Sequence, residues 1–164
     1  MYMIYIYRKA TINELERIWE KNIADNPGDR RWIVWKNEAI ENNKANKSTT
    51  FVVLCDNEPI GEGSLLFSPD CKAIQGRLEL SNNISIANIN ALRIQKSHEG
   101  QGHISKLMNE IENYAVQCGY SYLTIGVEAS ETRNLAIYLH WGYIEFVKSE
   151  IEENVLVLYY RKTL

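Results

Sequence analysis

Residues 86–108, with the sequence IANINALRIQKSHEGQGHISKLM, decide the fold that we expect for this chain. An alternating apolar run ends in a polar turn that contains Gly100 and Gly102, and a helical pattern begins directly after the turn. The apolar residues of one helix face recur at steps of three and four: Ile104, Leu107, Met108, Ile111, Ala115 and Cys118. Gly119 is placed to end this helix. The stretch therefore predicts a strand, a glycine turn and a helix in direct succession.

The glycine turn is a candidate site for a diphosphate. The first N–H groups of a helix have no partners inside it, and the helix dipole adds positive potential there. Glycines allow unusual backbone angles, and without a Cβ they leave room for a diphosphate. The Walker lysine–serine ending and the full G-x-G-x-x-G fingerprint are both missing from the turn. On the turn alone, a phosphate site and a plain strand-to-helix connection remain equally open.

Length and composition indicate one soluble domain spanning residues 1–164. The chain is 45% hydrophobic and 24% charged, with a net charge of −3. This mildly acidic balance argues against a nucleic-acid or membrane partner, because such surfaces need clustered Lys and Arg. No signal-peptide pattern and no run of roughly 18 apolar residues is present. We therefore expect a cytoplasmic protein.

The three cysteines, Cys55, Cys71 and Cys118, are odd in number and too far apart in sequence for a metal knuckle. Cys55 and Cys118 sit in apolar patterns, so we expect both to be buried, reduced thiols. The histidines also lack further ligands at useful spacing. No metal site is expected.

The chain before residue 86 predicts a strand, two helices and a hairpin. Thr11 and Glu14 have capping-box spacing, which marks the start of the first helix. Trp32 and Trp35 in the second helix either line a ligand cleft or pack in the core, and core packing is the simpler interpretation. The expected elements are a strand at 1–7, helices at 11–22 and 31–46, and hairpin strands at 50–55 and 60–67.

Residues 68–85 are polar and irregular, which predicts a long loop with a short strand at Arg77 to Leu80 as an option. The role of this loop is left open. The remaining pattern predicts a strand at 85–95, the helix that follows the glycine turn, a strand at 122–127, a helix at 131–141, and hairpin strands at 143–149 and 155–161. The strand at 122–127 is parallel to the strand at 85–95 if the helix between them is a right-handed crossover.

This order of elements resembles the GNAT superfamily of acetyl-CoA-dependent N-acetyltransferases over essentially the whole chain. Two motifs carry the resemblance locally. The family's diphosphate turn aligns with Glu99-Gly100-Gln101-Gly102-His103-Ile104, in which the central glycine is kept. The family's short helix, with its Tyr, Gly and aromatic spacing, aligns with Ala136-Ile137-Tyr138-Leu139-His140-Trp141-Gly142-Tyr143. Glu99, Ile104 and Glu131 depart from the family's usual residues.

The resemblance implies a mixed α/β fold. We expect a central, mostly antiparallel mixed sheet of six to seven strands flanked by four helices. A parallel, splayed pair of strands would form the cofactor cleft. Paired subunits are common in the family, so a homodimer is an open option and the oligomeric state is not determined by the sequence.

By the same resemblance, acetyl-CoA or CoA would bind along the opening stretch. Backbone groups of Leu92, Arg93 and Ile94 would pair with the pantetheine arm. The diphosphate would be held mainly by N–H groups of the turn and helix start: Gly100, Gln101, Gly102, His103, Ile104 and Ser105. Glu99 would face solvent beside them, and Asn134 would supply a further polar contact. The side chains of His98 and His103 either bond phosphate or are ordinary surface histidines.

Tyr138 is the expected catalytic residue, meeting the departing CoA sulfur. A phenol has a pKa of about 10 and a thiol of about 8.5, so full proton transfer is uphill by about 2 kcal/mol. Tyr138 should therefore act mainly as a hydrogen-bond donor to the developing thiolate. Its alternative role is aromatic packing on the sheet.

The general base is left open by the sequence. An amine with a pKa of about 10.4 is almost fully protonated at neutral pH, so it needs help to attack. Where histone-acetylating members of the family have a Glu, this chain has Asn88, which cannot take a proton. Glu62, Glu79 and Glu128 are the candidates, directly or through water, and each is otherwise a surface carboxylate.

The expected activity is transfer of acetyl from acetyl-CoA to a primary amine of a small molecule or peptide, by direct attack on the thioester. The alternative of a different class is a catalytically silent CoA-binding sensor or partner-binding domain, motivated by Glu99, Ile104 and the missing strand Glu. A nucleotide-binding α/β protein is a third option. The acceptor amine itself is not identified by the sequence.

Overall fold

The computed structural model describes residues 2–164; Met1, which the expected first strand included, lies outside the described residues. The helices and strands follow the predicted order, with one unexpected 3-10 turn, η1. The elements are β1 (Tyr5–Lys9), α1 (Ile12–Asp25), α2 (Arg31–Lys44), β2 (Ser48–Cys55), β3 (Glu58–Leu66), β4 (Ile86–Ile94), η1 (Lys96–His98), α3 (His103–Gln117), β5 (Tyr122–Glu128), α4 (Thr132–His140), β6 (Glu145–Glu152) and β7 (Val155–Thr163).

The seven strands within residues 2–164 form one mixed sheet in the order β1-β2-β3-β4-β5-β7-β6. Strand β1 pairs antiparallel with β2, and β7 pairs antiparallel with both β5 and β6. Strands β4 and β5 are parallel, in a register that runs from Ile86 opposite Tyr122 to Ile89 opposite Ile125. The predicted fold class, a mostly antiparallel mixed sheet with one parallel pair and four α-helices, is confirmed.

The chain forms two compact units. The first comprises the residues up to Leu65 together with Ala91–Asn113, and the second comprises Leu66–Asn90 and Tyr114–Leu164. Strands β3 and β4 and helix α3 each contribute residues to both units.

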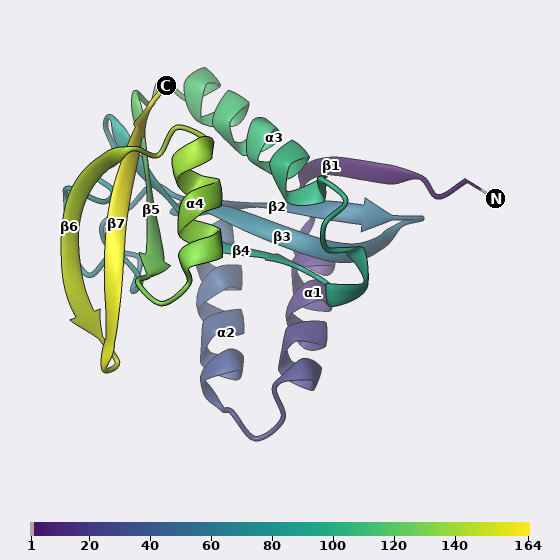
Figure 1. Ribbon diagram of the computed structural model, residues 1–164. Coiled ribbons are helices and arrows are strands. Elements are labelled where there is room, and N and C mark those ends of the chain that lie inside the picture. Colours follow the sequence, from purple (N-terminus) through teal and green to yellow (C-terminus); the bar gives the residue numbers. More distant parts are fainter. Residues whose placement is uncertain (1) are drawn as a thin grey trace. The chain divides into compact units, whose positions relative to one another are not determined.

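Helix α1 in the first unit begins with the predicted capping box. The Thr11 hydroxyl accepts from the Glu14 N–H at 3.2 Å, and the Glu14 carboxylate accepts from the Thr11 N–H at 2.9 Å. Helices α1 and α2 lie side by side (Figure 1), and Leu15 of α1 is buried in a hydrophobic cluster against which side chains of α2 pack. Trp32 and Trp35 pack against this core cluster, as in the simpler interpretation, and both are half-buried.

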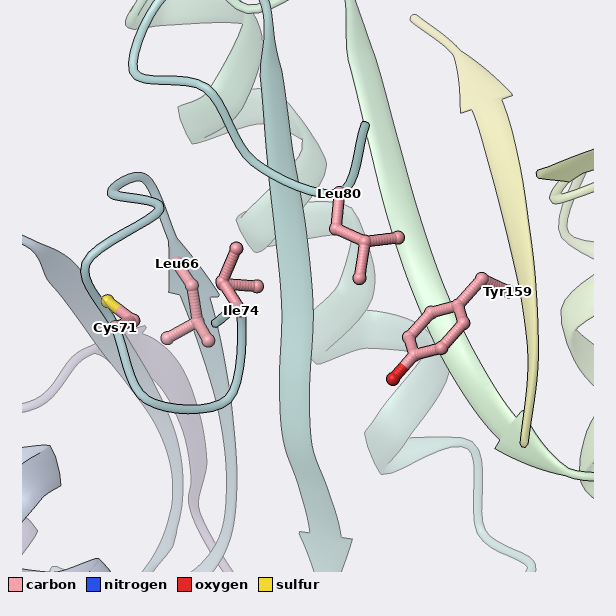
Figure 2. Close-up of a cluster of buried hydrophobic side chains, with 5 residues drawn as sticks. All are labelled: Leu66, Cys71, Ile74, Leu80 and Tyr159. Atoms are coloured by element: carbon pink, nitrogen blue, oxygen red, sulfur yellow. The ribbon is translucent and has the colours of Figure 1, made fainter. Parts of the chain in front are cut away.

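The loop after β3 is anchored in the second unit by a hydrophobic cluster. Figure 2 shows its members, whose side chains come from the end of β3, from the loop and from β7: Leu66, Cys71, Ile74, Leu80 and Tyr159. The optional strand at Arg77 to Leu80 is wrong, since these residues form turns. The Arg77 guanidinium bonds the loop's own carbonyls, those of Ile74 and Ala73, both at 2.8 Å, and this stabilises a turn rather than an extended chain.

The cysteine prediction is wrong in part. Cys71, inside the loop, is buried, whereas Cys118 is exposed and Cys55 is half-buried. Helix α3 ends at Gln117, so Cys118 lies in the turn beyond the buried helix face. None of the three cysteines forms a disulfide within residues 2–164. Within residues 2–164, no helix combines the length and apolar content that a membrane crossing requires.

Replacing Leu80 by alanine should destabilise the protein by about 2–5 kcal/mol, because it leaves a cavity in the cluster that anchors the loop. Leu80 is 0% exposed and Leu78 is 59% exposed in the same loop, so Leu78→Ala is the matched control. That control should change the free energy of unfolding by less than about 0.5 kcal/mol. Urea unfolding of both variants measures the difference, and equal effects would contradict the anchoring role.

Candidate functional site

The predicted glycine turn is present between η1 and α3. Gly100 and Gly102 have φ values of 74° and 83°, in the left-handed region that side chains with a Cβ rarely adopt. A Cβ added at either glycine would meet no other described atom within 4 Å. Glycine is therefore required here for backbone conformation and not for lack of space.

The first turn of α3 offers backbone donors, as predicted from the sequence. The first intrahelical bond runs from the Lys106 N–H to the Gly102 carbonyl at 3.2 Å. The N–H groups of His103–Ser105 precede this bond, so they have no acceptor within the helix. Glu99 is exposed, which agrees with the expectation that its side chain faces solvent. This end of α3 can hold an anion through its main chain.

The side chain of His103 is buried, so the expectation of a surface histidine is wrong. Its Nδ1 lies 2.7 Å from the Tyr7 hydroxyl and its Nε2 lies 3.1 Å from the Gln101 Oε1. The amide oxygen can only accept, so Nε2 carries the proton and Nδ1 accepts from Tyr7. Both ring nitrogens are thus used within the protein, and only the backbone N–H of His103 remains for a phosphate.

Burial lowers the pKa of His103, and the nearby His98 and Lys106 lower it further. The imidazole is therefore neutral at pH 7 and ties the start of α3 to β1.

Strand β4 changes conformation at Ala91, between its two halves. Ala91 has a φ of 54°, an uncommon left-handed value for a residue with a Cβ. The parallel register of β4 with β5 ends at Ile89. The three residues expected to contact pantetheine, Leu92–Ile94, lie beyond this point. Beyond them, the Gln95 N–H donates to the Ile60 carbonyl of β3 at 2.7 Å. Such an irregularity re-aims the backbone groups of a strand, and it occurs often next to active sites.

A buried polar cluster lies beside this part of β4, and sequence reasoning did not find it. Glu62 of β3 is 1% exposed, and its Oε2 accepts from the Asn22 amide at 2.8 Å. Its Oε1 lies 3.6 Å from the Arg93 Nη1, within ion-pair range but beyond a hydrogen bond. The Arg93 guanidinium carbon lies 4.9 Å from the ring centre of Trp19 and 4.8 Å from that of Trp32.

Three polar atoms of this cluster are buried without a hydrogen-bond partner among the described residues: Glu62 Oε1, Arg93 Nη1 and Trp19 Nε1. Burial raises the pKa of Glu62, and the charge of Arg93 and the bond from Asn22 oppose this rise. One sequence signal was available, because Glu62 is the one carboxylate in the interior of β3, where it stands between Gly61 and Gly63 and most of the other residues are apolar.

Tyr138, the expected catalytic residue, lies on α4 in the second unit. It is half-buried, and its ring lies 5.8 Å from that of Trp141 between centroids. Burial raises the pKa of Tyr138, and the charge of Glu131 raises it further. Asn134 is exposed on the same helix and donates to the Glu131 carboxylate at 3.1 Å.

Asn88, which stands where a glutamate is expected in histone-acetylating members, has a structural role in the second unit. Its amide donates to the Thr124 hydroxyl at 2.9 Å, and that hydroxyl donates to the Leu80 carbonyl at 2.7 Å. All the side chains involved are buried. The chain of bonds holds β4, β5 and the loop together, and it would not tolerate a charged carboxylate without repacking.

The three candidate bases have different environments. Glu79 pairs with Lys148 at 2.6 Å, and the pKa of Glu79 is lowered by that bond. Glu128 is exposed at the end of β5. Glu62 alone among the three is buried.

A sequence model of the Acetyltransferase (GNAT) family matches residues 8–143 of the chain. No curated protein sequence gives a significant match. Among solved structures, the PaiA N-acetyltransferase of Thermoplasma acidophilum in complex with coenzyme A superposes with a TM-score of 0.66 at 16% identity, over 98% of this chain and 99% of that one.

Two further solved structures have the same fold. The ribosomal-protein-alanine N-acetyltransferase of Brucella melitensis has a TM-score of 0.70 at 15% identity, over 97% of this chain and 99% of its own. An acetyltransferase of Salmonella typhimurium that modifies the N-terminal serine of ribosomal protein L7/L12 has a TM-score of 0.70 at 13% identity, over 99% of both chains.

Lowering the pH should destabilise the wild-type protein more than its His103→Gln variant. The pKa of His103 is lowered in the folded state, so the unfolded chain binds this proton first. The stability that neutral His103 contributes is present above the unfolded pKa of about 6.5 and is lost as the pH falls through the folded pKa.

Urea unfolding between about pH 7.5 and about pH 5 measures this pH dependence. The exposed His140→Gln variant is the control and should keep the wild-type slope. A His103→Gln slope equal to that of the wild type would contradict the assignment.

Proposed function

The chain belongs to the acetyltransferase (GNAT) family, and we propose that it transfers acetyl from acetyl-CoA to a primary amine of a small molecule or peptide. The observation that carries the proposal is the glycine turn before α3. Its left-handed glycines precede the free N–H groups of His103–Ser105, which suit the diphosphate of CoA. The fold is shared with the PaiA N-acetyltransferase that holds coenzyme A.

In this proposal, the main chain of the first unit holds the cofactor. The N–H groups from Gly100 to Ser105 bind the diphosphate, and Leu92–Ile94 pair with the pantetheine arm. The left-handed Ala91 supports this role, because it separates these residues from the part of β4 that pairs with β5. A backbone donor near Ile94 polarises the thioester carbonyl as an oxyanion site does. Asn134 remains a further polar contact to CoA.

The reaction is a direct transfer. The amine nitrogen attacks the thioester carbonyl, a C–N bond forms, and the C–S bond breaks as CoA leaves. The amine's proton goes to a base, and the sulfur receives a hydrogen bond from Tyr138. Because burial raises the pKa of Tyr138 above its usual value of about 10, this phenol donates a hydrogen bond more readily than it gives up its proton.

Glu62 is the base that we favour among the three candidates. Glu79 is engaged by Lys148, and Glu128 is exposed. Glu62 lies next to Arg93, one of the residues expected to contact pantetheine, and its Oε1 has no hydrogen-bond partner within the described chain, although it lies within ion-pair range of Arg93. Burial raises the pKa of Glu62, which brings it closer to the pKa of an amine and favours proton transfer.

Further parts of the proposal concern the whole chain. We infer one acetyltransferase domain, since the family match spans residues of both units and the chain passes between them within β3, β4 and α3. A cytoplasmic location is supported by the odd number of cysteines, none of which forms a disulfide within residues 2–164. A homodimer stays an option.

An amine panel read by release of free thiol tests the function. Polyamines, aminoglycosides, amino acids and N-terminal peptides are each offered with acetyl-CoA, and CoA release with at least one of them is expected. Stabilisation by acetyl-CoA without release over the whole panel would favour the silent sensor instead. Stabilisation by ATP or NAD but not by CoA would favour a nucleotide-binding protein.

Tyr138→Phe should lower the rate of CoA release about ten- to hundredfold, because one hydrogen bond to a developing charge is lost. The ring and its contact with Trp141 are kept, so the affinity for CoA, measured by calorimetry, should be nearly unchanged. The half-buried Tyr160→Phe in the same unit is the control and should react at the wild-type rate. An unaffected rate in Tyr138→Phe would remove this phenol from the mechanism.

Glu62→Gln should lower kcat/KM about a hundredfold at neutral pH, as expected when a general base is lost. The wild-type rate should rise with pH through the raised pKa of Glu62, because the base works only when it is ionised. That ascending limb should be absent from the pH–rate profile of the variant. Glu79→Gln should keep both the rate and the limb; if it loses them and Glu62→Gln does not, the base is misassigned.

A further inference from the structure

We propose that Glu62, Arg93 and Trp19 form the acceptor pocket of the first unit, and that its ligand is a free α-amino acid held through both its ammonium and its carboxylate. The proposal rests on the acetyltransferase function proposed above and names the class of acceptor. Three elements, α1, β3 and β4, bring these side chains together.

The unpartnered atoms define what the pocket can bind. Glu62 Oε1, as a carboxylate oxygen, accepts hydrogen bonds. Arg93 Nη1 and Trp19 Nε1 act only as hydrogen-bond donors. A buried polar atom without a partner costs about 1–3 kcal/mol, and more when it is charged. The structure thus holds one acceptor and two donors that a polar ligand would satisfy.

The charges of the pocket match a zwitterion. Glu62 has one oxygen occupied by Asn22 at 2.8 Å, which leaves the other for an ammonium. The guanidinium of Arg93 and the indole N–H of Trp19 supply two donors, which suit the two oxygens of a carboxylate. Glu62 Oε1 and Arg93 Nη1 are 3.6 Å apart, so the direct hydrogen bond between them has not formed. A ligand that has only an ammonium group, or only a carboxylate, would leave at least one of these three polar atoms without a hydrogen bond.

The two tryptophans fix the direction of the guanidinium. Trp19 and Trp32 place their rings 4.9 Å and 4.8 Å from the Arg93 guanidinium carbon, and stacked Arg side chains are held in orientation by such faces. The Arg93 side chain is 31% exposed and Trp32 is half-buried, whereas Glu62 and Trp19 are buried. The partly exposed side of the cluster is thus the one beside Trp32 and Arg93, and a ligand that reaches Glu62 from there must displace the side chains that cover its Oε1.

This placement fits the proposed reaction. An ammonium bonded to Glu62 Oε1 would lose its proton to that carboxylate and attack as the neutral amine. Arg93 belongs to the part of β4 expected to hold pantetheine, so the amine would be delivered next to the cofactor strand. Polyamines lack the carboxylate, and a peptide N-terminus offers one neutral carbonyl oxygen in its place.

The test compares matched ligands on the full-length protein. L-amino acids are paired with their decarboxylated amines and with their amides, and binding is measured by calorimetry in the presence of CoA. At least one amino acid should bind about tenfold more tightly than both of its partners. Equal binding of an acid and its amine across the panel, or tighter binding of N-terminal peptides, would overturn the proposal.

One variant and its matched control test the indole donor. Trp19→Phe keeps an aromatic face for Arg93 but removes the unpartnered N–H, so it should weaken binding of the amino acid and leave binding of its decarboxylated amine unchanged. Trp35→Phe, on a half-buried tryptophan outside the three-atom set, should change neither. Equal losses in both variants, or equal losses for acid and amine in Trp19→Phe, would contradict carboxylate recognition.

The comparison of acid and amine needs only the wild-type protein, so it holds even if a variant does not fold.

The experiments distinguish failure of the acceptor assignment from failure of the proposed transfer activity. CoA release with amines, but no preference for amino acids, would overturn only the acceptor assignment. Amino-acid binding without CoA release from acetyl-CoA would support the pocket and overturn the transfer activity.

Discussion

The conformation of β4 is the constraint on which the rest of the site depends. Up to Ile89 this strand pairs in parallel with β5, and at Ala91 its backbone turns left-handed. A non-glycine residue in that region costs of order 1–3 kcal/mol, and such strain persists only where the surrounding structure enforces it. Gly61 of β3 is part of that surrounding structure, because a Cβ there would lie 2.9 Å from the Arg93 carbonyl oxygen. The close approach of β3 holds this half of β4 in place.

The start of α3 is fixed by a second, separate device. His103 bonds Tyr7 and Gln101 through its two ring nitrogens, so its neutral side chain faces the protein while its N–H points along the helix axis. A positively charged imidazole would add attraction for a diphosphate, but it would have to donate to Gln101 and to Tyr7 at once. In the proposed site, main-chain donors would hold the anion, and the neutral histidine fixes the position of the helix start.

Local features were predictable from the sequence, and distant pairings were not. The capping box of Thr11 and the left-handed glycine at 102 depend on residues a few positions apart, so spacing alone identifies them. The bond between Tyr7 and His103 joins residues 96 positions apart, and a single sequence holds no trace of it. The neighbours of Glu62 could not be predicted for the same reason, although a carboxylate within an apolar strand marks the position.

The buried cluster around Glu62 is costly for stability, and that cost argues for a function. A buried ion pair is often no more stabilising than an apolar pair of the same volume, even when its hydrogen bonds are complete. Here the hydrogen bonds are incomplete, since Glu62, Arg93 and Trp19 each have a buried atom without a hydrogen-bond partner in the described chain. Replacing only Glu62 by leucine would leave the buried Arg93 charge and the Asn22 amide without this partner, so only apolar residues in place of the whole cluster would remove the penalty. Retaining a carboxylate, a guanidinium and an indole N–H in one place is explained if all three are completed by a ligand.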